Sequence, residues 1–312
     1  MAIVNNLPQY TEEHRLPLIR KAVIGNRSAK EFNLETGIKG ATALNLLNTD
    51  VKFGDGYNCG WNEAGTSTLS QRVLTPGAIK VNMSFCDKSL LKSFANYEVR
   101  VAAGQKTLPF EEDFMAGVTE GIAANLEKAM WQGDTDSLDV NLSKFDGIEK
   151  IVAAESSAID VTVNSNDTAT SILSAVYSAI PEAVFSKGEV VIYLKASLYR
   201  KYIQELIANG NLVITTAMND VAMPESILMP GTNVRVIPID GMSNYAYASY
   251  KDNFVYGVDM TGDDEKIEMW YSQDNREFRL AVEFIAGVQV AYPEFVVYTD
   301  VQPVHQAEQP AE

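Results

Sequence analysis

Histidine, the most common general base, is scarce in this sequence, whereas carboxylates are plentiful. The only two histidines, His14 and His305, lie in the terminal segments. A Ser-His-Asp or Cys-His site would have to borrow its histidine from an end of the chain, so the sequence disfavours histidine-based catalysis. Cys59 and Cys86 are too few for a disulfide scaffold or a metal cluster. We expect free thiols, at least one of them buried, and a Cys59–Cys86 bridge is the alternative. Hydrolysis by carboxylates alone stays open, because the chain has 41 acidic residues.

The motif that most resembles a metal-binding site is GDTDSLD. Its residues Asp134, Asp136 and Asp139 are spaced like the first ligands of a calcium loop. Leu138 stands where the fifth oxygen ligand is required, and no glutamate closes the loop, so we interpret the motif as a polar turn. GDDE, residues 262–265, is interpreted as a hairpin turn. The glycine spacing of GDGYNCG does not fit a dinucleotide fingerprint, and no GxxxxGK[ST] phosphate loop occurs. We predict no catalytic, metal-binding or cofactor-binding residues.

Charge is distributed unevenly along the 312 residues. The net charge of −16 and the pI near 4.6 describe a surface that repels phosphate backbones, which disfavours nucleic-acid binding by the whole chain. The segment before residue 31 is locally basic, with Arg15, Arg20, Lys21, Arg27 and Lys30 against Glu12 and Glu13. This segment is either a solvated arm or a contact to an acidic partner, and both interpretations stay open.

Sequence patterns for membrane insertion or export are not found. No apolar run approaches the length that a membrane-spanning helix needs, and the opening residues do not show a signal-peptide pattern. We therefore expect no membrane association and a chain that stays inside the cell that makes it.

A glycine-rich segment, residues 48–75, has no helical period and few core-forming residues. Ordering a backbone costs on the order of 1–2 kcal/mol per residue, and this segment cannot recover that cost by folding on itself. As a two-stranded projection it would reach ~45 Å at ~3.3 Å per residue. It is either a surface loop over a small local core or an arm that reaches a neighbour. In the second case its contact residues would be Phe53, Tyr57, Trp61, Leu69 and Arg72.

The remaining pattern is that of a mixed α+β protein. Phe114, Val118, Ile122, Leu126 and Met130 recur at four-residue steps and predict a helix over 110–131, about 33 Å long at ~1.5 Å per residue. Alternating apolar residues predict a strand over 78–85 and a long strand over 277–299 that bends at Gly287. Residues 41–47 read as a short helix. Pro, Gln and Glu dominate from residue 302, which predicts a disordered tail.

The order of these elements resembles the major capsid protein of tailed bacteriophages, the fold named for phage Hong Kong 97. The resemblance is carried by GIKGATALNLLNTDVKFGDGYNCGWNEAGTSTLSQRVLT, LPFEEDFMAGVTEGIAANLEKAMWQGD, EVVIYLKASLYRKYIQEL and EFIAGVQVAYPEFVVYT, within residues 37–299. It implies an N-terminal arm (1–47), an extended E-loop (48–82), a peripheral P-domain (83–159) with a spine helix at 110–131, an axial A-domain (160–275), a strand returning to the P-domain (276–300) and a disordered tail (301–312).

The resemblance implies a function of assembly without catalysis. Copies would form the pentamers and hexamers of an icosahedral shell that encloses phage DNA without sequence-specific binding, assembled in the host cytoplasm and located in the virion. The E-loop residues above, and Arg15, Arg20 and Lys21 of the arm, would contact neighbouring subunits. Scaffold, portal and decoration proteins are further expected partners. Two alternatives stay open: an encapsulin-like cellular compartment, and an unrelated α/β enzyme with a carboxylate-only site.

Overall fold

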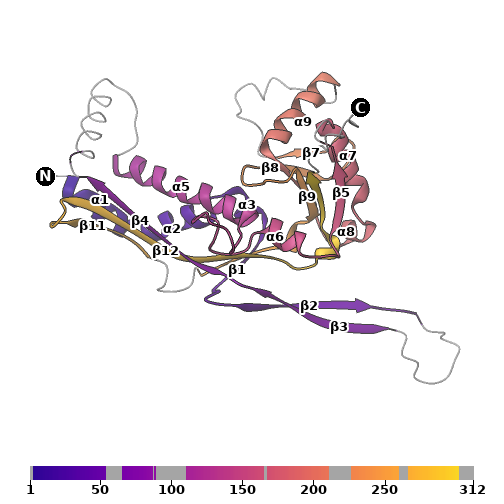
Figure 1. The fold of residues 1–312 in the computed structure, drawn as a ribbon, viewed down its shortest axis with the longest axis horizontal. Helices are drawn as coiled ribbons and strands as arrows, with labels where there is room; N and C mark the ends of the chain where they lie inside the picture. The colour runs from indigo at the N-terminus through magenta and orange to yellow at the C-terminus, as the bar shows by residue number, and fades with distance from the viewer. Residues whose placement is uncertain are drawn as a thin grey trace, which may run out of the picture.

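The computed structural model describes residues 3–53, 65–86, 88, 110–164, 167–210, 226–259 and 266–301. These residues form an α+β fold with sheets of five, six and two strands. Figure 1 shows helix α5 alongside the long strands β4 and β12, the second sheet with its helices at the opposite end of the body, and hairpin β2–β3 leading away from both. In the described part of the chain, no helix combines the length and apolar character that crossing a membrane requires.

The five-stranded sheet is organised around β12 (Glu277–Val290). Antiparallel β4 (Gly77–Cys86) pairs with its 277–286 portion, while β11 (Lys266–Ser272) and β10 (Phe254–Val258) pair with successive portions of it. Strand β1 (Asn33–Thr36) adds in parallel to β10. The side chains of β12 alternate between buried and half-buried, as the sequence predicts for this part. A Cβ on Gly287 would lie 2.7 Å from Pro76 Cα, so this glycine permits a close backbone approach.

The predicted strand over 277–299 is in fact two strands in two sheets. After β12, residues Pro293–Phe295 form the single 3₁₀ turn η3, and β13 (Val297–Val301) then joins the six-stranded sheet. The prediction of one continuous strand was wrong because Pro293 has no N–H to donate to a ladder and its ring restricts the backbone.

Helix α5 (Phe110–Gln132) confirms the predicted helix and extends it by one residue. Its core side includes Met115, Ile122, Leu126 and Met130, all buried. Phe114 and Val118, which belong to the predicted stripe, are only half-buried, because they line an open groove between α5 and β4.

The N-terminal segment is folded onto the body. Helices α1 (Ile3–Glu13), α2 (Arg15–Ile24) and α3 (Arg27–Glu31) precede β1. The Asn26 side chain begins α3 by accepting a hydrogen bond from the Ala29 N–H. The apolar side chains of these helices join the core that α5 and the five-stranded sheet share; the buried ones are Leu7, Leu18, Ile19, Ala22, Val23 and Ala29.

The six-stranded sheet has the order β5-β13-β9-β6-β8-β7. Its remaining strands are β5 (Ile159–Val163), β6 (Val190–Lys195), β7 (Ile227–Leu228), β8 (Arg235–Ile239) and β9 (Ala246–Tyr250). Helices α7 (Ala169–Ala179), α8 (Glu182–Lys187) and α9 (Ala196–Ala208) cover it, and together they enclose a second apolar core. Short α6 (Ile148–Ala153) and the 3₁₀ turn η2 (Lys251–Asn253) complete the described helical elements.

The third sheet is a hairpin of β2 (Thr42–Asp50) and β3 (Thr66–Leu74). The short helix predicted over 41–47 was wrong, since these residues belong mainly to β2. Leu44 and Leu46 lie two residues apart and so share one face of a strand. Leu46 is buried there against Leu74, and this tertiary contact overrides the local helical propensity of ATALNLL.

Candidate assembly surfaces

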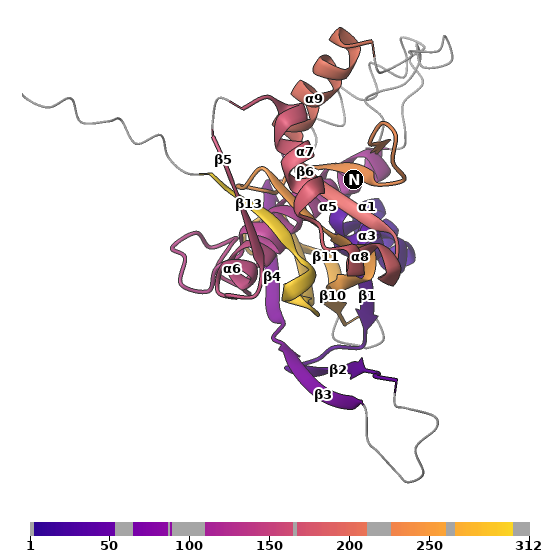
Figure 2. The same ribbon diagram turned by 90° about the vertical axis from the view of Figure 1, so that its right-hand side faces the viewer.

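The hairpin is fixed at its base. Leu46 and Leu74 are buried against Ile38, Val255 and Ala291 of the body. The Gln289 side chain donates a hydrogen bond to the Val73 carbonyl, with 2.7 Å between the nitrogen and the oxygen. The hairpin therefore leaves the body in a defined direction (Figures 1 and 2).

Arg72, one of the five predicted contact residues, belongs to this base. Its Nη2 lies 2.7 Å from Glu155 Oε1, and the pair is partly buried beside α6. Because both partners are in the same chain, the pair connects β3 to the body. The predicted contact of Arg72 with a neighbouring subunit stays a prediction.

Beyond its base the hairpin exposes an apolar face. Leu47 and Leu69 are directly opposite each other in the β2–β3 register, and they are 62% and 69% exposed. Val73, four residues along the same face from Leu69, is also exposed, and Phe53 just beyond β2 is 99% exposed. Tyr57 and Trp61, the other predicted contact residues, lie outside the described residues. We call Leu47, Phe53, Leu69 and Val73 the hairpin apolar residues.

The nine paired residues of each strand span ~30 Å at ~3.3 Å per residue, which is shorter than the ~45 Å expected for fourteen. A two-stranded hairpin is marginally stable in water by itself, because only one face can be buried and here that face is covered only at the base.

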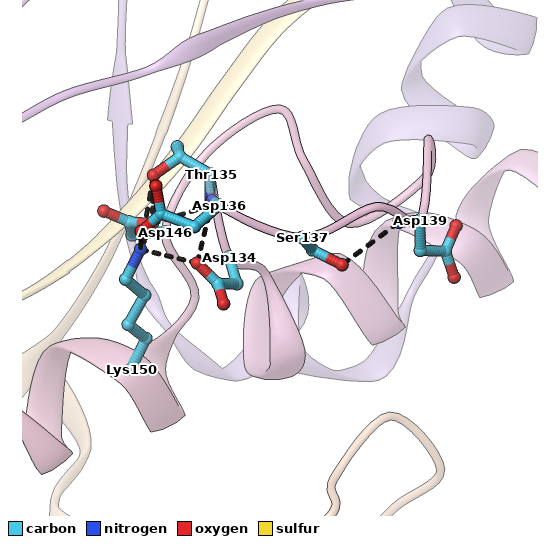
Figure 3. Close-up of polar contacts among 7 residues, drawn as sticks. All are labelled: Asp134, Thr135, Asp136, Ser137, Asp139, Asp146 and Lys150. Atoms are coloured by element: carbon cyan, nitrogen blue, oxygen red, sulfur yellow. Dashed lines mark hydrogen bonds and ion pairs between the residues drawn. The ribbon is translucent and has the colours of Figure 1, made fainter.

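The aspartates of the candidate calcium motif pair with a lysine side chain from α6. Figure 3 shows the Lys150 ammonium group among the aspartates of the loop between α5 and α6. Lys150 Nζ lies 2.5 Å from Asp134 Oδ1, 3.0 Å from Asp136 Oδ2 and 2.9 Å from Asp146 Oδ1. The hydrogen bond from Lys150 lowers the pKa of Asp134, and the aspartates raise the pKa of Lys150. This geometry favours the polar turn over the calcium loop.

A buried carboxylate joins the N-terminal segment to α5. Glu127 accepts hydrogen bonds from the Ser28 N–H at 3.1 Å and the Ser28 hydroxyl at 2.7 Å, and Trp131 Nε1 donates to the same hydroxyl oxygen at 2.7 Å. Burial raises the pKa of Glu127 despite the Ser28 hydrogen bonds. The sequence analysis did not identify this group, because Ser28 lies 99 residues before Glu127 and 103 residues before Trp131.

An ion-pair network closes the same junction on the side of β8. Arg235 Nη2 lies 2.8 Å from Glu31 Oε2, and its Nε lies 2.5 Å from Glu189 Oε1. Lys251 Nζ also approaches Glu31 Oε2, at 3.3 Å. Burial opposes ionisation of Glu31, but the hydrogen bonds and charges of Arg235 and Lys251 together outweigh it, so the pKa of Glu31 is lowered. The second core, the N-terminal segment and α5 are thereby held together.

The enzyme alternative would require carboxylates available in a cavity. A cavity of about 640 Å³ is lined by Glu31, Glu120, Glu127 and Asp240. Glu31 is ion-paired, Glu127 accepts the Ser28 hydrogen bonds, and Glu120 Oε1 lies 3.4 Å from Lys21 Nζ. Three of the four carboxylates therefore have structural partners. Among the described residues, no group of three or more His, Cys, Asp and Glu side chains is arranged to hold a metal.

The histidines and cysteines add little to catalysis in the described part of the chain. The His14 ring stacks on Tyr10 with 4.3 Å between ring centroids, at the exposed end of α1. Cys86 is exposed at the end of β4. Cys59 and His305 lie outside the described residues.

The basic residues expected to contact a neighbour lie on or at the start of α2. Arg15 is half-buried and Arg20 is exposed. Lys21 makes its exposed ion pair with Glu120 of α5. These residues belong to a helix packed on the body, and their predicted intersubunit contacts stay predictions.

No protein-family model and no curated protein sequence matches the chain. Solved structures do. A chain from the satellite phage P4 procapsid including size determination (Sid) protein is 9% identical, with a TM-score of 0.60, covering 92% of this chain and 91% of that one. A chain from Mycobacterium phage Ogopogo is 11% identical with a TM-score of 0.59, covering 88% and 91%. The virus-like particle from Pyrococcus furiosus gives 12% identity and a TM-score of 0.53, covering 92% and 98%.

These matches extend over 88–92% of this chain, so they concern most of the fold and not one local motif. The fold is the capsid fold named for phage Hong Kong 97, as the sequence resemblance implied. A spine helix and an E-loop are features of that fold.

Proposed function

We propose that this chain is a major capsid protein that assembles into the pentamers and hexamers of an icosahedral shell around phage DNA, with a structural and not an enzymatic role. The observation that carries the proposal is the hairpin. It is fixed at its base by buried Leu46 and Leu74, yet it holds Leu47 and Leu69 in water. In a monomer the apolar face of this projection stays in water, and it becomes buried when the projection lies on another copy.

The hairpin apolar residues are the proposed contact to the neighbouring subunit. Burying a Leu or Phe side chain contributes about 1.5–3 kcal/mol, so the hairpin supplies a modest contact. A subunit in a closed ring of heterologous contacts has several neighbours and makes several such contacts at once. The favourable free energies of these contacts then act together. Weak individual contacts therefore suffice for a stable shell.

The domain assignment follows the two large sheets. We assign α5 and the five-stranded sheet to the P-domain and the six-stranded sheet with α7, α8 and α9 to the A-domain. The E-loop then runs over residues 42–74 instead of 48–82, since β2 begins at Thr42 and β4 already belongs to the five-stranded sheet. The arm, 1–47 from the sequence, is reduced in this assignment to residues 1–41.

The acidic chain suits a container for DNA. A net charge of −16 means that a wall made of this chain does not bind the packed phosphate backbones strongly, so the genome can enter and leave. We place the assembled protein in the virion after assembly in the host cytoplasm. Scaffold, portal and decoration proteins are the proposed partners besides the chain itself.

An encapsulin-like compartment is the second candidate, because a virus-like particle from Pyrococcus furiosus has a similar fold and the fold does not separate the two candidates. The two candidates share the shell and differ in its content. Particles isolated from the native source should protect double-stranded DNA from nuclease if the chain is a phage capsid protein. A protein cargo with no protected DNA would support the compartment instead.

The proposal of a shell is tested by expressing the chain alone and with its neighbouring genes, followed by size-exclusion chromatography and electron microscopy. We expect closed particles in the megadalton range. A stable monomer or dimer under all these conditions would contradict the proposed function.

A further inference from the structure

The loop between α5 and α6 presents apolar side chains to water. Leu138 is fully exposed and Val140 is 70% exposed, although both are large aliphatic residues. Asp136 and Asp139, also exposed, flank Leu138 along the chain. We call Asp136, Leu138, Asp139 and Val140 the knuckle.

The knuckle belongs to a loop with many internal hydrogen bonds. At its base, the Gly147 N–H donates to the Gly133 carbonyl at 2.8 Å and the Asp134 N–H donates to the Leu142 carbonyl at 2.9 Å. Lys150 then connects three of its aspartates (Figure 3). The exposure of Leu138 is therefore a property of an ordered loop. Apolar residues preordered in water lose little further entropy on contact, which suits an interface.

A surface of matching chemistry lies on α2. Leu16, 66% exposed, is one helical turn before Arg20, and Pro17 is one turn before Lys21, so the four side chains share the outer face of the helix. We call them the α2 patch. Its neighbouring acidic groups are Glu120, which pairs with Lys21, and the exposed Glu12 and Glu13 that precede α2. The patch combines apolar surface with two cations. The knuckle combines apolar surface with two carboxylates, of which Asp136 also pairs with Lys150 of its own chain.

The two surfaces lie on opposite sides of the body. In Figure 2, α1 and α3, which flank α2 in the chain, lie on one side of β4, while α6 and the loop before it lie on the other. The knuckle of a chain therefore cannot reach its own α2 patch. Two different, complementary surfaces on opposite sides of one subunit are what a head-to-tail contact in a closed ring requires.

We propose that the knuckle of one copy docks on the α2 patch of the next copy, with Leu138 and Val140 against Leu16 and with Asp136 and Asp139 facing Arg20 and Lys21. This inference rests on the proposed function, because it names a contact within the proposed shell. It also gives the basic N-terminal segment its acidic partner, the loop of a second copy of this chain.

A charge swap tests the pairing. Arg20→Glu and Asp139→Lys should each lower the assembled fraction about tenfold at low salt, and the two together in one chain should restore most of it. Arg200→Glu, on an exposed position of α9, is the control and should leave assembly unchanged. Two inactive single variants with no recovery in the double variant would overturn the pairing, and so would single variants that assemble normally.

A crosslink separates this inference from the proposed function. In a Cys59→Ser and Cys86→Ser background, Leu16→Cys chains are mixed with Leu138→Cys chains and oxidised, in particles or, if none form, at high protein concentration. A Leu16–Leu138 disulfide between chains supports the contact. Shells without this disulfide would overturn the contact and leave the proposed function standing. Absence of both shells and disulfide would overturn both.

Discussion

Strands β12 and β3 show that apolar side chains are buried in the body and mostly exposed in the hairpin. In β12, Phe278, Leu280 and Val282 are almost completely buried between the sheet and the helices. In β3, Leu69 and Val73 are largely exposed, and only Leu74 at the base is buried. The body therefore has its stabilising contacts within one chain. The outer hairpin does not, and the difference separates residues that stabilise the subunit from residues available for association.

The largest effect is expected in the body, at Trp131. This side chain is completely buried among Phe32, Tyr193 and Phe254, and its indole N–H binds Ser28. Trp131→Ala should lower the free energy of unfolding by about 3–5 kcal/mol through the cavity it creates. Chemical denaturation of the subunit measures this. A loss near zero would show that the aromatic cluster is not the centre of the core.

Backbone packing in the body gives the next effect. Gly287→Ala places a Cβ 2.7 Å from Pro76 Cα and should cost about 1–3 kcal/mol of unfolding free energy, because both segments are held in or next to the sheet. Gly121→Ala on the open face of α5 is the matched control, and a gain of about 0.5–1 kcal/mol is expected there. Equal effects at the two glycines would contradict the close approach.

Glu127 gives the body a defined pH dependence. Because burial raises its folded pKa above the ordinary 4.5, the folded chain retains a proton that the unfolded chain releases. The stabilisation from this proton is complete below the ordinary pKa and is lost as the pH rises through the folded pKa. Glu127→Gln should therefore gain stability relative to the wild type as the pH rises above the ordinary carboxyl pKa of 4.5.

Denaturation curves at several pH values test this sign. Glu268→Gln, at an exposed position of β11, is the control and should show no such gain. If the difference between the Glu127→Gln variant and the wild type stays constant over the same pH range, Glu127 does not titrate in the way its burial indicates.

The hairpin should show the smallest change in subunit stability. The double variant Leu47→Ser, Leu69→Ser alters residues that are exposed in the single chain, so its unfolding free energy should stay within about 0.5 kcal/mol of the wild type. Its assembled fraction should fall strongly. Leu228→Ser, an equally exposed leucine in β7, is the control for both measurements. A variant that loses stability but still assembles would show that Leu47 and Leu69 stabilise the subunit and do not serve association.

Local patterns in the sequence identified the elements that are set by their own periodicity. The four-residue steps in 110–131 predicted α5, and alternation from Phe278 to Phe284 predicted the first part of β12. These patterns arise because one side of each element faces a core. The resemblance to capsid proteins then supplied the arrangement, which no local pattern contains.

The features that the sequence analysis missed depend on distant partners. The segment 41–47 is a strand because it pairs with β3, some 25 residues later. The N-terminal helices are fixed by contacts with α5 and β11, and Glu127 is positioned against Ser28. Lys150 lies 16 residues beyond Asp134, too far for motif spacing to show that an ammonium group would neutralise the loop.

The central claim is that the hairpin becomes buried only on another copy of the chain, and thiol labelling of Leu69→Cys tests it most directly. The variant is made in a Cys59→Ser and Cys86→Ser background, with Leu228→Cys as the reference, and labelled as dissociated subunits and as assembled particles. We expect equal rates at both positions in subunits, and labelling of residue 69 slowed by at least about tenfold relative to residue 228 in particles. Labelling of residue 69 at the same rate in particles and subunits would contradict the claim.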